Sequence, residues 1–515
     1  MLHVYWIVCA KTFPLTARRM SELTYHYGRM RAWEMLPGLL VWGTFAIAIL
    51  LSFFAPLWAI ILIILFDTLW LFRVVYYVFH ILAAWWEVRK ASRIDWMARV
   101  QEILSASKLR HLVFLPTYKE GVEILRATLT SLSHQSFPSD RLVIVLAGEE
   151  RDRERFEEHV RLLKKEFDHV FCAILSTVHP KDLPGEIPGK GSNLHWSGSE
   201  VAREIHMRFP DWRDEDIIVT AFDVDTIAHP QYFAYLTYIY ATTPNPTHSS
   251  YQPITLLCNN IWSAPAPVRI AAFGTTFWLM SELVRPERLW TFSSHSMPFA
   301  MLKDVGFWQK DIVSEDSRIF MQAFVHYHGD YRVTPLFLPV SMDTVVGDSY
   351  WQALKALYVQ QRRWAWGVEH LPFIIEAFRK DHTIPWRKRA KYVFNHIEGM
   401  YTWATAPLLI FLLGWLPLQM AQGQTAALVQ AAPYTLEMLM RGAMIGLFAS
   451  ALLSLVLLPS RPRQSSWTRW PFMLLQWILL PVTFIVFGAF PAIDAQTRFL
   501  LGRYLGFQVT RKKRG

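Results

Sequence analysis

Two aspartates separated by one residue follow an apolar stretch near the middle of the chain. Residues 217–222 read Ile-Ile-Val-Thr-Ala-Phe, which predicts a strand buried in a parallel sheet, and Asp223 and Asp225 come directly after it. Ligands of open α/β sheets bind at the carboxyl ends of strands. Mg²⁺ is usually held by one or two carboxylates together with substrate phosphates. The pair therefore predicts a metal–diphosphate site; the alternative is an acidic turn that caps a helix beginning near His229.

A loop rich in proline and glycine carries the next candidate groups. Residues 184–193 read Pro-Gly-Glu-Ile-Pro-Gly-Lys-Gly-Ser-Asn and precede a helix predicted to run to about Arg208. Backbone N–H groups of such a loop, together with the charge of Lys190, can hold a phosphate. As a lone signal this is weak, and a solvated turn ahead of a helix cap is the alternative.

Three further groups of residues are candidates with a structural alternative each. Glu315 and Asp316 stand just ahead of a helix predicted at 318–327, where acidic residues commonly complement the helix dipole. His295, in isolation, is more often a satisfied core histidine than a catalytic one. Gln360, Arg363 and Trp364 share one face of a predicted helix that can grip a diphosphate and stack a sugar ring, or can lie on a membrane surface.

The elements that must position these residues alternate from about residue 95. Strands are predicted at 111–116, 141–147, 170–176 and 217–222, with helical patterns at 121–134, 149–167 and 193–208 between them. Repeated β-α-β units predict a parallel, doubly wound sheet.

The composition indicates that this sheet belongs to a membrane protein. The 515-residue chain is 52% hydrophobic with 23 Trp and 34 Phe, and its mean hydropathy is +0.18. Its net charge of +10 is explained first by cytoplasmic loops and anionic lipid headgroups, and no nucleic-acid partner is expected. The three cysteines are far apart and predict neither a disulfide framework nor a zinc site.

Apolar runs at 36–53 and 57–74 predict a transmembrane hairpin near the N-terminus, with the basic N-terminal tail in the cytoplasm. Asp67 lies inside the second run. An intramembrane acid is a functional candidate, and the equally weighted alternative is a carboxylate near the interface that pairs with Arg73.

The C-terminal region contains three further apolar runs, at 406–418, 442–458 and 472–490. Three full spans would place the basic tail outside. Because the tail is basic, we expect it in the cytoplasm, and Pro481 and Pro491 allow the last run to be re-entrant or broken. Residues 495–507 are then expected at the membrane interface.

With these residues in view, the chain resembles the membrane-integrated family 2 glycosyltransferases of the cellulose, chitin and hyaluronan synthase type. The shared pattern runs from about His111 to Trp364 and reappears at the C-terminus, in the family order. Each motif alone is weak, but six in order are very unlikely by chance. The motifs are Pro116-Thr117-Tyr118-x-Glu120, Lys190-x-x-Asn193, Asp223-x-Asp225, Glu315-Asp316, Gln360-Gln361-x-Arg363-Trp364 and the gating-loop motif Phe507-x-Val509-Thr510-x-Lys512.

The resemblance implies an α/β GT-A catalytic domain, Rossmann-like with a mostly parallel sheet, inserted between N- and C-terminal transmembrane helices. It implies inverting transfer from a nucleotide-diphosphate sugar, with a UDP-sugar expected and Mg²⁺ or Mn²⁺ as cofactor. The implied regions are a tail and hairpin (1–94), the catalytic domain (95–350), interfacial helices (351–391), a C-terminal membrane region (392–493) and an interfacial segment with the gating-like tail (494–515).

The resemblance also implies roles for the site residues. Asp316 is the general base with Glu315 beside it, Asp225 and Asp223 hold the metal, and Trp364 and His295 contact the acceptor. Glu149 stands where the family usually has an aspartate that reads the base, which makes uridine less secure. The set implied to bind the nucleotide sugar is Thr117, Tyr118, Glu120, Glu149, Lys190, Asn193, Asp223, Gln360, Arg363 and Lys512.

These features predict an integral membrane protein, in the cell membrane, with the catalytic domain and both termini cytoplasmic. The expected partners are a nucleotide sugar, a sugar polymer or lipid-linked acceptor, and membrane lipids. Processive polysaccharide synthesis, with or without translocation, is favoured by the Gln-Arg-Trp and gating motifs. Transfer of one sugar to a lipid is favoured by the small membrane part. A non-catalytic scaffold is disfavoured by the intact acidic residues.

Overall fold

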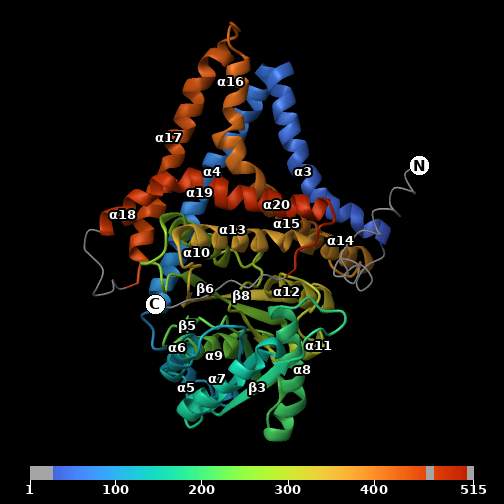
Figure 1. Cartoon of the computed structure of the whole chain (residues 1–515), viewed down its shortest axis with the longest axis vertical. Coiled ribbons are helices and arrows are strands. Elements are labelled where there is room, and N and C mark those ends of the chain that lie inside the picture. Colours follow the sequence, from blue (N-terminus) through green and yellow to red (C-terminus); the bar gives the residue numbers. More distant parts are fainter. Residues whose placement is uncertain (1–26, 460–468, 507–515) are drawn as a thin grey trace.

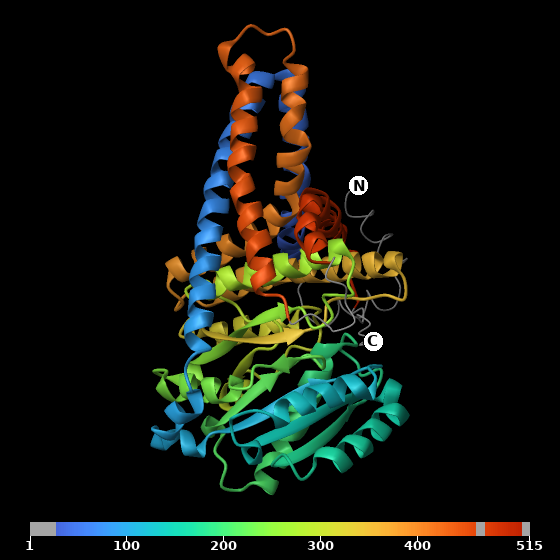
Figure 2. The same ribbon diagram turned by 90° about the vertical axis from the view of Figure 1, so that its left-hand side faces the viewer.

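The computed structural model describes residues 27–459 and 469–506. A mixed α/β layer occupies one end of the molecule and a bundle of long helices the other (Figures 1 and 2). All strands come from residues 110–342, and the long apolar helices come before and after that region in the chain.

A single eight-stranded sheet has the order β3-β2-β1-β4-β7-β6-β8-β5. Its four strands from β3 to β4 are all parallel, which confirms the parallel sheet predicted from the alternating pattern. The strands are β1 (Arg110–Pro116), β2 (Leu142–Glu149), β3 (Ala173–His179), β4 (Ile217–Ala221), β5 (Ile227–Ala228), β6 (Ser249–Leu257), β7 (Ser296–Pro298) and β8 (Arg332–Met342).

Helices cover both faces of the sheet, which explains why its central strands β1, β2 and β4 are largely apolar and buried. Leu112 and Phe114 of β1 belong to one buried cluster, and Val113 and Leu115 to the other. The first cluster includes α8 (Lys190–Arg208), α10 (Ala266–Leu283), α11 (Phe299–Asp304) and α12 (Glu315–His326). The second includes α6 (Val122–Ser133), α7 (Arg153–Phe167) and α9 (Tyr232–Thr242).

The short strand β7 brings a distant segment to the site. It pairs antiparallel with β4, and the N–H of Ala221 donates to the carbonyl of His295 at 3.0 Å. Residues 291–295 therefore lie beside the end of β4. This antiparallel insertion was not predicted.

The helical bundle contains the long apolar helices α3 (Tyr27–Phe54), α4 (Pro56–Ala91) and α17 (Ala427–Val456). Four helical segments of the described chain are long and apolar enough to cross a membrane. A fifth arises if the bent pair of α15 (Trp386–Phe411) and residues 413–420, which includes α16 (Leu416–Met420), is counted as one span. Gly442 and Gly446 let α17 approach α4 closely, because a Cβ at either position would meet Leu71 or Val74.

The last apolar segment is helical from residue 469 to residue 500 and changes its winding along the way: α18 (Arg469–Leu475), a 3₁₀ turn at 476–479, α19 (Leu480–Phe484), a π-helical turn at 485–489 and α20 (Phe490–Leu500). In Figure 1 α20 lies across the foot of the bundle, and in Figure 2 it is seen nearly end-on. It contacts α13 (Tyr350–Ala365), where Arg362 forms a 2.9 Å ion pair with Asp494. Residues 470–500 count as one of the four candidate spans, so a re-entrant or broken course at the prolines stays a prediction.

Candidate functional site

The loop after β1 is shaped by its own glutamate. Glu120 Oε2 accepts hydrogen bonds from the Thr117 hydroxyl at 3.0 Å and from the backbone N–H of Tyr118 at 2.6 Å. Thr117, Tyr118 and Glu120 line the main cavity, and so does Glu149 from the end of β2. The carboxyl ends of neighbouring parallel strands thus face one space, where ligands of α/β sheets bind.

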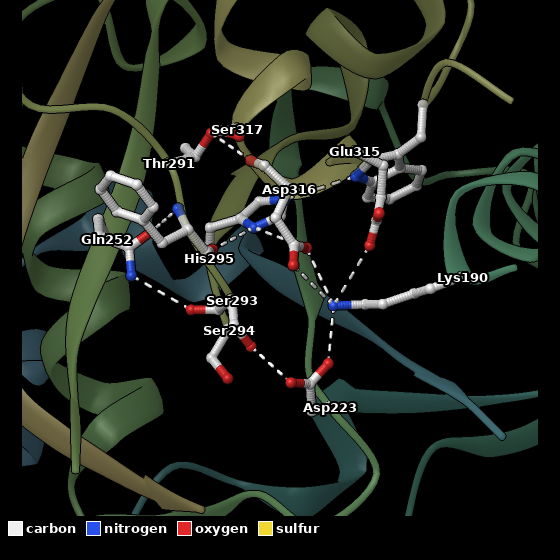
Figure 3. A network of polar contacts seen from close by, with 12 residues as sticks. Lys190, Asp223, Gln252, Thr291, Ser293, Ser294, His295, Glu315, Asp316 and Ser317 are labelled. Atoms are coloured by element: carbon white, nitrogen blue, oxygen red, sulfur yellow. Dashed lines mark hydrogen bonds and ion pairs between the residues drawn. The ribbon is translucent and has the colours of Figure 1, made fainter. Parts of the chain in front are cut away.

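A lysine joins the acidic motifs at the centre of the site. Lys190 Nζ lies 2.7 Å from Asp223 Oδ1, 2.9 Å from Asp316 Oδ1 and 3.8 Å from Glu315 Oε1 (Figure 3). Burial opposes the charged form of Lys190, but the three carboxylates raise its pKa. Lys190 and Asp316, which are 126 positions apart in the chain, therefore meet in this cluster.

Local packing explains why this meeting is possible. A Cβ on Gly191 would lie 3.0 Å from the Cβ of Glu315, so glycine lets the start of α8 approach the start of α12. The N-terminal end of α12 is also held by Glu369, whose Oε1 accepts the N–H groups of Val313 and Ser314 at 3.1 and 2.9 Å. Sequence reasoning missed Glu369, which follows the Gln-Arg-Trp helix by only a few residues.

The two members of the acidic pair have different surroundings. Glu315 is buried, and burial followed by the charge of Asp316 raises its pKa to about 8. The Asp316 side chain keeps about 25% of its surface exposed. The charged form of Glu315 is thus disfavoured by its surroundings, whereas Asp316 faces the cavity as a hydrogen-bond acceptor for Lys190.

One continuous cavity of about 1590 Å³ connects this cluster with the membrane-side helices. Its wall includes Lys190, Asp223 and Asp316 at the sheet end and Asp67 and Trp403 at the bundle end. The site and the bundle therefore share a single space.

The two aspartates of the Asp-x-Asp motif point in different directions. Asp223 lines the cavity, and its Oδ2 accepts a hydrogen bond from Ser293 at 2.8 Å. Asp225 is fully buried, and its Oδ2 accepts the backbone N–H of Asp343 at 3.0 Å. Within residues 27–459 and 469–506, no three His, Cys, Asp or Glu side chains form a metal-binding group. Asp223 fits a metal shared with a diphosphate; the role of Asp225 stays a prediction that requires its carboxylate to leave Asp343.

Asn193 and His295 are more enclosed than the sequence suggested. Asn193 Nδ2 donates to the carbonyl of Ala147 at 3.0 Å and so fastens α8 to the end of β2. His295 has no exposed surface; its Nδ1 hydrogen-bonds to the Phe292 carbonyl at 2.7 Å, and burial lowers its pKa. Its Nδ1 also lies 3.8 Å from Asp316 Oδ1. The predicted contact of His295 with an acceptor stays a prediction.

The Gln-Arg-Trp helix reaches the cavity as its spacing predicted. Gln360, Arg363 and Trp364 of α13 all line it. Burial raises the pKa of Glu315, and the charge of Arg363 opposes part of that increase. Lys512 and the rest of the gating-like motif lie outside the described residues.

A buried histidine holds the predicted base-reading residue. His179, at the end of β3, lies between Glu149 Oε2 at 3.1 Å and Glu186 Oε2 at 2.8 Å. Burial alone would favour the neutral ring, but the two carboxylates raise the pKa of His179. Glu186 belongs to the loop that leads to Lys190. The sequence carried no signal for this contact, because strand register decides which strand-end residues meet.

No family model and no curated protein matches the sequence. One solved structure with some likeness is the mannosyltransferase PcManGT from Pyrobaculum calidifontis in complex with GDP-Man and Mn²⁺. The two sequences are 16% identical, and the match covers 77% of this chain and 99% of that chain with a TM-score of 0.40. TarS 1–349 from S. aureus in complex with UDP-GlcNAc is 14% identical, and the match covers 67% of this chain and 90% of that chain with a TM-score of 0.35. GalNAc-T7 with UDP, GalNAc and Mn²⁺ is 10% identical, and the match covers 57% of this chain and 58% of that chain with a TM-score of 0.33. These neighbours are glycosyltransferases, but TM-scores this low carry no conclusion about the present chain.

Proposed function

We propose that this chain is a membrane-bound, inverting glycosyltransferase of the GT-A type that uses a nucleotide-diphosphate sugar. The observation that carries the proposal is the meeting of Asp223, Lys190 and Asp316 at the carboxyl edge of the sheet, on the wall of a cavity that continues into the apolar helices. A diphosphate needs cationic partners, and an acceptor hydroxyl needs a carboxylate base.

The base and the donor loops have separate tasks in this proposal. The Thr117–Glu120 loop and Glu149 hold the nucleoside, with a UDP-sugar as the expected donor. Lys190 and Arg363 face the diphosphate. Asp316 takes the proton of the acceptor hydroxyl as its oxygen attacks the anomeric carbon; the bond from that carbon to the diphosphate breaks, and the product has inverted configuration.

A divalent cation fits this chemistry. Mg²⁺ or Mn²⁺, held by Asp223 and, after rotation, by Asp225, would stabilise the negative charge that develops on the leaving diphosphate. Lys190 occupies the position beside Asp223 in the ligand-free site and must share that carboxylate with the cation.

Two acceptors are compatible with this donor site. The preferred product is a polysaccharide, made processively and passed toward the bundle, because Trp364 and further aromatic side chains follow the cavity. Transfer of one sugar to a lipid is the second candidate, since Ile410, Phe411 and Leu439 make part of the wall apolar.

The test is to incubate the purified protein with a panel of nucleotide sugars and to measure the nucleoside diphosphate released and the size of the product. We expect Asp316→Asn to reduce turnover by about 10²–10⁴-fold with donor binding retained. The matched control is Asp330→Asn, at a carboxylate whose side chain is 80% exposed. Release from no donor would reject the enzyme, and an Asp316→Asn variant with normal turnover would reject this base.

A further inference from the structure

The entry into α12 is held by a side chain from another part of the chain. Glu369 Oε1 accepts the backbone N–H groups of Val313 at 3.1 Å and of Ser314 at 2.9 Å. In the described structure the N-cap residue Ser314 gives no side-chain hydrogen bond to the backbone of the first turn. Glu369 therefore supplies the negative charge that a helix N-terminus favours, and Asp316 in that turn is left to face the cavity.

The residue after Glu369 holds the other side of Asp316. Arg318 Nε donates to His370 Nδ1 at 3.1 Å, and His370 Nε2 lies 2.7 Å from the hydroxyl oxygen of Ser317. Because a guanidinium can only donate, Nδ1 is the acceptor, and the proton of the neutral ring sits on Nε2 and points to Ser317. Burial, followed by the charge of Arg318, lowers the pKa of His370 and keeps the ring neutral.

The buried charge of Arg318 makes this attachment specific. The Arg318 side chain is 2% exposed, and it also donates to Gln309 Oε1 at 2.7 Å and to the carbonyl of Glu369 at 3.2 Å. Its guanidinium lies 4.2 Å from the ring centroid of Phe373 in α14 (His370–Lys380). A buried charge is costly without such partners, so α12 can take only a narrow range of positions against the start of α14.

The same stretch of chain carries the Gln-Arg-Trp side chains. Arg363 and Trp364 lie at the end of α13, and a 3₁₀ turn at 366–369 joins that helix to Glu369. Trp366 in this turn is 1% exposed, and its Nε1 donates to Glu369 Oε2 at 3.0 Å. Both carboxylate oxygens of Glu369 are therefore engaged, one by the base turn and one by the stretch that positions Arg363.

This link fixes the separation of two groups that must act on one anomeric carbon. An in-line displacement needs the leaving diphosphate and the attacking hydroxyl on opposite sides of that carbon. We propose that Glu369 is a positioning residue, which holds Asp316 at the correct distance from Arg363 by binding the backbone at the entry of α12. This role rests on the proposed function, in which Asp316 is the base and Arg363 faces the diphosphate. It concerns the chemical step and leaves donor binding intact.

Steady-state kinetics of the full chain in detergent, with released nucleoside diphosphate as the signal, test this role. Glu369→Ala should lower kcat by about 10²-fold, the effect of a misplaced reacting group, with the donor KM changed by less than about twofold. Glu369→Gln keeps one acceptor oxygen but turns an NH₂ group toward the indole N–H of Trp366, and it should lower kcat by about tenfold. Adding Trp366→Phe to Glu369→Gln removes this donor–donor contact and should restore part of kcat.

The matched control is Glu376→Gln, which removes a carboxylate of α14 that pairs with Arg379 at 2.5 Å, and its kcat should be normal. A double-mutant cycle with Asp316→Asn then separates positioning from stability. Because Glu369 acts through the base, Glu369→Gln should cost little more in the Asp316→Asn protein, whereas a merely structural role would multiply the two losses.

Hydrogen exchange tests the contact itself without turnover. The amides of Val313 and Ser314 should lose protection in both Glu369 variants and keep it in Glu376→Gln. Unchanged protection, a normal kcat in both Glu369 variants, an effect mainly on the donor KM, or multiplied losses with Asp316→Asn would each overturn the proposal. A wild type that protects these amides but releases no nucleoside diphosphate from any donor would reject the proposed function and, with it, this role of Glu369.

Discussion

At the scale of single residues, the site is organised by one cation among three carboxylates. Lys190 forms close ion pairs with both Asp223 and Asp316, which belong to the donor and base motifs respectively. Each of these carboxylates is therefore engaged by Lys190. Under the proposed function, a bound donor would have to draw Lys190 toward its diphosphate before Asp316 could accept a proton from an acceptor.

Replacing this lysine tests that coupling. We expect Lys190→Met to lower kcat/KM for the donor by about 10²–10³-fold, because the diphosphate loses a preorganised cation and the carboxylates repel one another. Initial rates of nucleoside diphosphate release measure it. Lys303→Met is the matched control, since Lys303 pairs with Asp214, which precedes β4 at the end opposite to Asp223, and the change should leave kcat/KM unchanged. A loss of less than a few-fold would show that Lys190 only stabilises the fold.

His179 gives the donor loops a pH dependence with a defined sign. Burial favours the neutral ring of His179, but Glu149 and Glu186 face its two ring nitrogens and raise its pKa above the ordinary value. The stabilisation that the protonated ring provides is fully present below the unfolded-state pKa of about 6.5. It is lost as the pH rises through the higher folded-state pKa. Stability and donor affinity should therefore fall as the pH is raised above about 6.5.

The measurement is the thermal midpoint and the donor KM across this range for the wild type and for His179→Gln. The variant should lose most of the slope. His134→Gln, at an exposed histidine on the end of α6, should keep it. An identical slope in wild type and His179→Gln would contradict this role.

The sequence motifs identified the residues that line the cavity. They did not identify the residues that hold those side chains in place. Thr117, Lys190, Asp316 and Arg363 all line the cavity as expected. The buried position of His295 was weighed as the ordinary alternative, and the structure favours it. Glu369 could not be found because its partners Val313 and Ser314 lie more than fifty residues earlier in the chain. Glu186 is only seven residues from His179, but their contact depends on how the loop after β3 folds back.

At the scale of elements, the close approach of α17 to α4 depends on glycine. A Cβ at Gly446 would clash with Cγ1 of Val74, on the helix that carries Asp67. We expect Gly446→Ala to destabilise the protein by about 1–3 kcal/mol, the usual cost of overpacking. Gly43→Ala, where no atom lies within 4 Å of the added Cβ, should be neutral or slightly stabilising in thermal unfolding. Equal midpoints for the two variants would show that the helices separate without cost.

The first half of the sheet was predictable because its strands are short apolar runs between strong turn signals. Predicted strand boundaries at 111–116 and 217–222 agree with β1 and β4 within a residue or two. The strand β7 has only three residues and includes a proline, so it is too short to show an alternating or apolar sequence pattern that would predict a strand. The acidic pair was expected before a helix, whereas α12 begins at Glu315, which places both acids in its first turn.

At the scale of the whole molecule, one hydrophobic core crosses the boundary between sheet and bundle. The cluster around β1 and α10 also contains Ile81 and Ala84 of α4, Leu453 of α17 and Trp477 near α18. The predicted catalytic domain therefore shares its core with the helices that flank it in the chain.

Expression of residues 95–350 alone tests this sharing. The isolated fragment would expose the apolar surface of α10 that α4 and the segment at 476–484 cover in the full chain. We expect the fragment to aggregate, as measured by size-exclusion chromatography with light scattering, while the full chain in detergent elutes as a defined species. A monodisperse fragment that binds a nucleoside diphosphate would show that the sheet folds independently.

The helix α4 continues without a break for 36 residues, about 54 Å, from the tip of the bundle to the edge of the sheet. That exceeds the hydrocarbon thickness of a bilayer, roughly 30 Å. Under the proposed function, a rod of this length that is fixed at one end to the core of the sheet could not tilt to match a thinner or thicker membrane without moving the residues around Lys190 and Asp316. Lipid composition would then act on this chain as a mechanical setting of the proposed active site.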